Sequence, residues 1–191
     1  MTVTTIPSAG ITDATIDTAD IKDNAVTAAK ASGLGITVAD HWRITSDFTG
    51  DATPLSANWE RVDTAGQGYS GSGGMAVSSG IWTFPSTGIY FVEFNSQHSW
   101  TSTSFYNTAN IKITTDNGSF TTVAEGDSSQ TMGADSGTWY TVSRVYTMVD
   151  VTDTSNVKIQ FNIDVNFASV TTRGSSSVNL THATFTRLGD T

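Results

Sequence analysis

The side chains best able to do chemistry in this 191-residue sequence are scattered. The three histidines, His41, His98 and His182, lie far apart, and none has a histidine or carboxylate neighbour at the short spacing of a metal site. Cysteine is absent, which excludes disulfides and cysteine-based metal sites. We therefore predict no metal and no cofactor, and we interpret each histidine as a strand or surface residue.

Two pairs of carboxylates are close enough in sequence to suggest glycoside chemistry, Asp150 with Asp153 and Asp47 with Asp51. All four fall at predicted turns, where aspartate commonly accepts hydrogen bonds from the backbone, so a structural role is favoured. The sequence also lacks a Gly-x-Ser-x-Gly nucleophile motif. We expect a protein that is not an enzyme.

Aromatic residues at predicted loops are better candidates for a binding site. Trp100, Phe105 and Tyr106 fall in or near one loop, and Trp139 starts a strand after another. Exposed rings on loops suit the recognition of sugars or proteins. We predict that the 100–106 and 126–139 loops form a receptor-contact rim. The alternative is that these rings cap the ends of the core.

The elements that position these loops are predicted to be strands. Threonine, serine and glycine are abundant and lysine and glutamate are scarce, which favours short strands and turns over helices. Alternating apolar residues predict strands over 39–45, 59–63, 75–77, 80–84, 89–100, 107–115, 120–124, 138–151, 157–167 and 178–188. A polar loop is expected over 126–137. Turns every 8–12 residues and no amphipathic helix after residue 35 indicate an all-β sandwich or barrel.

A hairpin over residues 82–94 organises this pattern. Pro85 closes the first strand because it fixes φ and has no N–H to donate, and Gly88 gives the turn its freedom. In the second strand Tyr90, Val92 and Phe94 face one way and the residues between them face the other. Large side chains on both faces predict that both faces are covered, and a neighbouring subunit is one candidate for the second cover.

Phe84-Pro85-x-x-Gly88-x-Tyr90 resembles the signature hairpin of the C1q/TNF-like jelly rolls, and a similar order of motifs runs through about residues 40–189. The resemblance implies a ten-stranded jelly roll that packs as a trimer and binds proteins, glycans or lipids. It makes Tyr90 and Phe94 candidates for the trimer seam, with core packing as the alternative for each. No residue matches a calcium ligand of the family.

Residues 1–35 follow a different pattern, in which one apolar residue recurs every five positions: Ile6, Ile11, Ile16, Ile21 and Val26. A period of five fits neither a strand nor a helix, and so few units cannot bury a core alone. We predict an arm ordered only by sister chains or a larger particle, with a short helix over 24–33; the alternative is a disordered tail. The stretch 11–30 resembles the N-terminal repeats of bacteriophage fibre proteins.

The net charge and the hydropathy of the chain argue against two classes, nucleic-acid-binding proteins and membrane-inserted proteins. A net charge of −9 disfavours nucleic-acid binding, and no apolar run approaches the roughly 18 residues that span a bilayer, so no membrane insertion is expected. Residues 1–7 lack the pattern of a signal peptide. A virion component released by lysis fits these features.

Together these features predict a non-enzymatic bacteriophage virion protein. Residues 1–35 would trimerise the chain or anchor it to other capsid or tail proteins, and residues 36–191 would form a C1q/TNF-like trimeric knob that binds a host surface glycan or protein. Alternatives are a head or tail decoration protein, a bacterial lectin-like protein and a depolymerase.

Overall fold

The computed structural model describes residues 21, 35–69, 73–131 and 137–191. The chain divides into two units, Met1–Leu34 and Gly35–Thr191. Of the predicted arm before residue 35, Ile21 is described and is exposed. The other repeat positions, Ile6, Ile11, Ile16 and Val26, and the expected helix over 24–33 lie outside the described residues.

The described residues form twelve strands and no helix, which confirms the all-β prediction. The strands are β1 (Ala39–Ile44), β2 (Phe48–Thr49), β3 (Trp59–Arg61), β4 (Ala76–Ser78), β5 (Ile81–Thr83), β6 (Gly88–Trp100), β7 (Ser104–Thr114), β8 (Thr121–Gln130), β9 (Trp139–Val151), β10 (Lys158–Val165), β11 (Thr171–Thr172) and β12 (His182–Gly189). This part of the chain contains no helix with the length and apolarity needed to cross a membrane.

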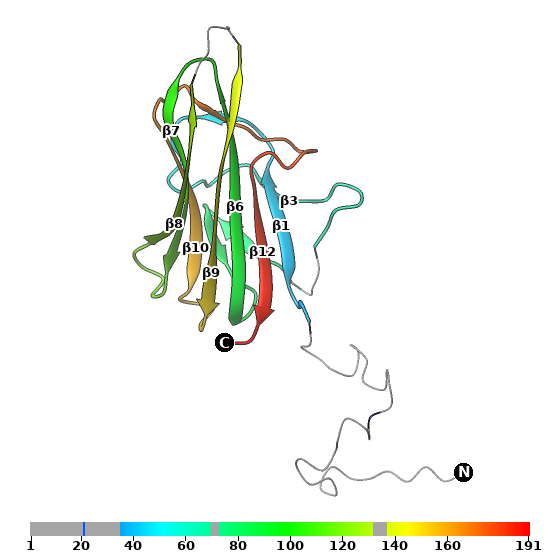
Figure 1. Cartoon of the computed structure of the whole chain (residues 1–191). Coiled ribbons are helices and arrows are strands. Elements are labelled where there is room, and N and C mark those ends of the chain that lie inside the picture. Colours follow the sequence, from blue (N-terminus) through cyan, green and yellow to red (C-terminus); the bar gives the residue numbers. More distant parts are fainter. Residues whose placement is uncertain (1–20, 22–34, 70–72, 132–136) are drawn as a thin grey trace, which may run out of the picture. The chain divides into compact units, whose positions relative to one another are not determined.

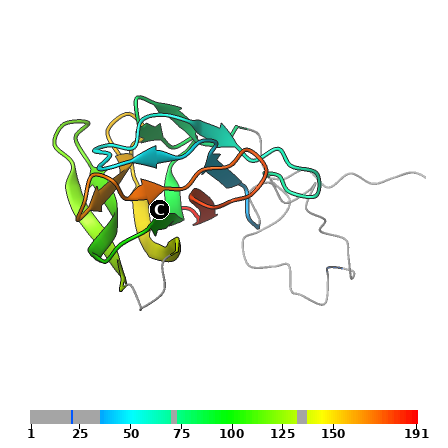
Figure 2. The same ribbon diagram turned by 90° about the horizontal axis from the view of Figure 1, so that it is seen from above.

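Two antiparallel sheets make up the sandwich (Figure 1). One has seven strands in the order β2-β11-β6-β12-β1-β3, with β9 on the free edge of β6, and the other has five in the order β4-β5-β10-β7-β8. The long strand β6 pairs with β9 from Gly88 to Trp100 and thus runs the height of the sandwich. We call the end at Trp100 the rim end and the end at Gly88 the entry end. Figure 2 looks down on the rim end, where β2 and β11 lie side by side.

The predicted turn before β6 is confirmed, and its glycine is required. Gly88 has a φ of 138°, which L side chains rarely adopt. A Cβ at this position would lie 2.5 Å from both the Gly189 carbonyl oxygen and the Arg187 Nε. The close packing of β6 against the end of β12 therefore depends on having no side chain here.

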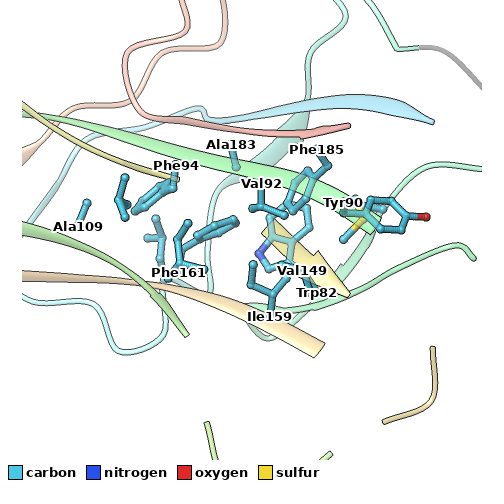
Figure 3. Close-up of a cluster of buried hydrophobic side chains, with 14 of the residues drawn as sticks. Trp82, Tyr90, Val92, Phe94, Ala109, Val149, Ile159, Phe161, Ala183 and Phe185 are labelled. Carbon is cyan, nitrogen blue, oxygen red and sulfur yellow. The ribbon is translucent and has the colours of Figure 1, made fainter. Parts of the chain in front are cut away.

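The core lies between the sheets and is dominated by aromatic rings (Figure 3). Trp82, fully buried, meets Trp42 and Trp59 edge-on at centroid distances of 5.2 and 5.0 Å. Phe94 and Phe161 stack across the two sheets at 4.6 Å. Offset and edge-on ring pairs add to the free energy of burial, so this cluster fixes how one sheet lies on the other.

The interior changes from apolar to polar toward the rim end. Ser96, His98, Asn107 and Ser143 are fully buried there. Ser143 Oγ donates to the Asn107 carbonyl oxygen, and Ser128 Oγ lies 2.8 Å from Ser143 Oγ. These side chains satisfy one another, as buried polar groups must.

Several predicted strand boundaries were wrong, and the strand expected from residue 107 begins at Ser104, within the predicted 100–106 loop. The strand expected over 120–124 continues to Gln130, so most of the predicted loop over 126–137 that the structure describes is strand β8. The polar residues of β8 can form a strand because one face of β8 meets solvent and its other face meets the polar interior at the rim end. The last strand begins at His182 rather than at residue 178.

Candidate functional site

Exposed aromatic rings gather at the rim end of the sandwich. The turn from β6 to β7 and the ends of β8 and β9 meet there, since Trp100 pairs with Trp139 and Ser104 with Gln130. We define the aromatic rim by these residues: Trp100, Phe105, Tyr106, Trp139, Tyr140 and Phe167. Phe105 is 74% exposed and Tyr140 56%. The predicted rim residues are therefore brought together, whereas their role in receptor contact stays a prediction.

Trp100 differs from the other predicted rim residues. It is half-buried and its ring lies 4.6 Å from that of Phe167, packed against the core. Here the alternative prediction, a ring capping the end of the core, describes the structure better. Phe167 follows β10 and was not predicted as a rim residue, because a single phenylalanine after a strand carries no signal of its own.

A β-bulge explains why two consecutive aromatic side chains are exposed. The register of β7 with β8 shifts between Ser104 and Asn107, so Phe105 and Tyr106 together face one residue of β8. In a regular strand these two neighbours would point to opposite faces. The bulge leaves Ser104 and Asn107 buried while both rings reach solvent.

Hydrogen bonds hold the bulge in place. Ser104 Oγ donates to the Tyr106 carbonyl oxygen at 3.0 Å, and the Asn166 N–H donates to the same oxygen at 3.1 Å. The Phe105 N–H donates to Asn166 Oδ1 at 3.4 Å. The backbone beneath both rings is thereby tied to the segment after β10.

A second exposed apolar surface covers the outer face of the seven-stranded sheet. It consists of odd-numbered residues of β6 and even-numbered residues of β9 and β12. Its apolar members are Ile89, Phe91, Tyr140, Val142, Tyr146, Met148 and Leu188. Tyr146 and Met148 are 64% and 65% exposed. Large apolar side chains side by side in solvent mark a surface that another molecule covers.

Tyr90 and Phe94, the predicted seam residues, do not belong to this surface. Both are fully buried in the core of the sandwich. The predicted alternation along β6 is correct, and the alternative given for these two residues, packing in the core, describes the structure. The opposite set, with Phe91 half-buried beside Tyr146 at a ring distance of 5.8 Å, faces outward.

A polar group interrupts this apolar face. His41 and His182 lie with their ring centroids 5.1 Å apart, and Glu93 beside them pairs with Arg144. The Nε2 atom of His41 is buried and has no hydrogen-bond partner. Burial lowers the pKa of both histidines, and for His41 the neighbouring His182 adds to the effect. Both rings are therefore held neutral at neutral pH.

The buried Ser96–His98 pair superficially resembles a nucleophile and its base. Ser96 Oγ lies 2.8 Å from His98 Nε2, and Thr172 Oγ1 lies 3.2 Å from His98 Nδ1. The Thr172 hydroxyl thus takes the place that a carboxylate has in a hydrolase triad. Ser96, His98 and Thr172 are all fully buried. Burial lowers the pKa of His98 to about 4. The i, i+2 spacing could have revealed the pair, since such residues share one face of a strand.

Of the carboxylates singled out in the sequence, Asp153 stabilises a turn, Asp47 and Asp51 bind the backbone of distant segments, and Asp150 lies in strand β9 rather than at a turn. Asp153 accepts hydrogen bonds from the Ser155 N–H and hydroxyl, which lower the pKa of its carboxyl group. Asp47 accepts from the Gly174 N–H, and Asp51 accepts from the Val165 N–H. Within the described ranges, no three histidine or carboxylate side chains group together as metal ligands would.

Comparison with solved structures identifies the fold. Murine APRIL superposes with a TM-score of 0.53 at 17% sequence identity, over 79% of this chain and 98% of that one. Eiger TNF from S. frugiperda superposes with a TM-score of 0.56 at 10% identity, over 82% of this chain and 96% of that one. The sandwich is a TNF-like jelly roll. No known protein family and no curated protein matches the sequence. At these identities the similarity establishes the jelly-roll fold alone.

The buried His98 makes a testable prediction about acid stability. Its pKa is about 4 in the folded state against 6.5 for an unperturbed histidine, so the unfolded chain takes up the proton first as pH falls. The contribution is complete above pH 6.5 and is lost as pH falls to about 4, and this loss amounts to roughly 3 kcal/mol of unfolding free energy. Urea unfolding at pH 7.5 and pH 4.5 measures this loss.

His98→Asn is the matched variant, because asparagine does not titrate in this range. We expect it to be less stable than the wild type at pH 7.5 but to lose less stability on acidification. His41 and His182 are unchanged in both proteins, so their effect cancels in the comparison. Equal losses in the two proteins would contradict the assignment to His98.

Proposed function

We propose that this chain is a non-enzymatic structural protein of a bacteriophage virion: a homotrimeric jelly-roll knob, anchored through residues 1–35 and binding a host cell surface at its aromatic rim. The observation that carries this proposal is the separation of the rim from the point where the chain enters the sandwich. The resemblance of residues 11–30 to fibre-protein repeats supports the virion context.

The two ends of β6 show this separation. The chain enters at β1, where Ala39 pairs with Thr186 beside Phe91, close to the start of β6. The rim lies at the other end of β6, thirteen residues from Gly88 to Trp100, which extend over about 40 Å. A particle attached through the residues before β1 would leave the rim free to meet a second surface.

The outer face of the seven-stranded sheet is proposed to bind two further copies of this chain. The trimer that the hairpin resemblance implies needs an apolar surface on each subunit, and Tyr146 and Met148 supply one. Its neutral polar group, His41 with His182, can be covered at neutral pH without burying unpaired charge.

Met148→Lys tests this surface. Placing an ammonium group in a covered apolar interface costs free energy through desolvation, so we expect self-association to weaken at least tenfold. Val123→Lys is the matched control, because Val123 is an exposed apolar residue on β8 of the other sheet. Light scattering after gel filtration measures the mass, and circular dichroism verifies folding. Equal masses for the two variants would contradict the assignment.

Self-association is also expected to weaken between pH 7.5 and pH 5. Both histidines have pKa values below 6.5, so they are neutral at pH 7.5 and gain charge on acidification. Two cations 5.1 Å apart would then lie near Arg43 and Arg144, with Glu93 and Asp40 as opposing charges. The double variant His41→Gln, His182→Gln should keep its mass over this range. If it dissociates as the wild type does, the pair is not the cause.

Host attachment is tested by changing the rim of the intact virion. Removing both rings of the bulge with Phe105→Ala and Tyr106→Ala should lower adsorption to host cells at least tenfold, while Val123→Ala leaves it unchanged. Both rings are exposed, so the double variant should fold normally. Unchanged adsorption would favour a decoration role for the knob instead.

A further inference from the structure

The bulge presents Phe105 and Tyr106 as a fixed aromatic platform. Neither ring contacts another aromatic ring in the described part of the chain, unlike Trp100, whose ring packs on Phe167. Their backbone is held by Ser104 and Asn166. Ligand binding therefore requires little ordering of the chain, which lowers the entropic cost of association.

The polar groups around this platform are mostly uncharged. Hydroxyl and amide side chains that are exposed or half-buried occupy the rim end at Thr101, Ser102, Ser129 and Asn166. Arg173 is the nearby cation, and its guanidinium lies 4.9 Å from the centre of the Tyr140 ring. Such groups can exchange hydrogen bonds with ligand hydroxyls without desolvating a charge.

The edge of the rim toward the five-stranded sheet is acidic. Asp127 accepts a hydrogen bond from the Thr108 hydroxyl, and Asp164 lies next to Thr108 across β7 and β10. Burial raises the pKa of Asp164, with Asp51 and Asp127 adding to the effect. Together with the net charge of −9, these carboxylates repel anionic ligands.

We propose that the Phe105–Tyr106 platform binds neutral polysaccharide, with the C–H face of a pyranose ring stacked on each aromatic ring and sugar hydroxyls bonded to the surrounding hydroxyl and amide groups. This class of ligand combines apolar ring faces with uncharged donors and acceptors, and the platform offers both. A protein receptor is less well matched, because Phe105 and Tyr106 are exposed and, among the described residues, no other aromatic ring packs against them to form the apolar centre of a protein interface.

This inference rests on the proposed role of the rim in attachment, and binding to immobilised polysaccharides tests it separately. The full chain is applied to neutral glucan, galactan and mannan and to the acidic galacturonan, alginate and polysialic acid, with dissociation constants from biolayer interferometry. We expect at least one neutral polymer to bind, and at least tenfold more tightly than every acidic one. Failure to bind any neutral polymer, or preference for an acidic one, overturns the inference.

Variants locate the binding. Phe105→Ala and Tyr106→Ala should each weaken binding at least tenfold, Phe105→Trp should keep it, and Val123→Ala should not change it. Saturation-transfer NMR should place the contact on ring C–H protons of the sugar. Binding that survives both alanine variants overturns the inference.

Virions that need the rim for adsorption although the chain binds no neutral polymer would leave the proposed function standing and refute the saccharide. If the rim binds sugar but virions do not need it for adsorption, the saccharide inference stands and the proposed role of the rim in attachment is refuted.

Discussion

The aromatic packing between the two sheets is the interaction on which the rest of the structure depends. Trp82 and Phe161 from the five-stranded sheet meet Phe94 and Phe185 from the seven-stranded sheet, all fully buried. Because side chains alternate along a strand, fixing the inward set on β6 also decides which residues face outward. The core thus determines the outer apolar face as well as the register of the sheet that bears it.

The same constraint explains what the sequence could and could not predict. The alternation along β6, β9 and β10 was visible because large apolar residues recur at every second position. It showed that β6 has two different faces, but not which face turns inward, since each face carries a large aromatic side chain, Tyr90 on one and Phe91 on the other. That choice depends on packing against Phe161 and Phe185, which come from distant parts of the chain.

The candidate site shows a similar limit. Loop aromatics predicted where exposed rings gather, and antiparallel pairing brings Trp100 and Trp139 to one end. The bulge that exposes Phe105 and Tyr106 together leaves no sequence signal, because it depends on pairing with β8, a strand too polar to be predicted at its full length. Residues that depend on a local irregularity therefore need the structure to be recognised.

The polar interior beneath the rim has a consequence for the motions of the sandwich. Opening the apolar half would expose Trp82, Phe94 and Phe161 to water, whereas Ser96, Asn107 and Ser143 can exchange their internal hydrogen bonds for bonds to water. Separation of the strands is thus less costly at the rim end than around the tryptophans. Backbone amides near Asn107 should exchange with solvent through partial opening, and those near Phe161 through complete unfolding. The aromatic rim thus lies over the half of the sandwich that can open without losing the fold.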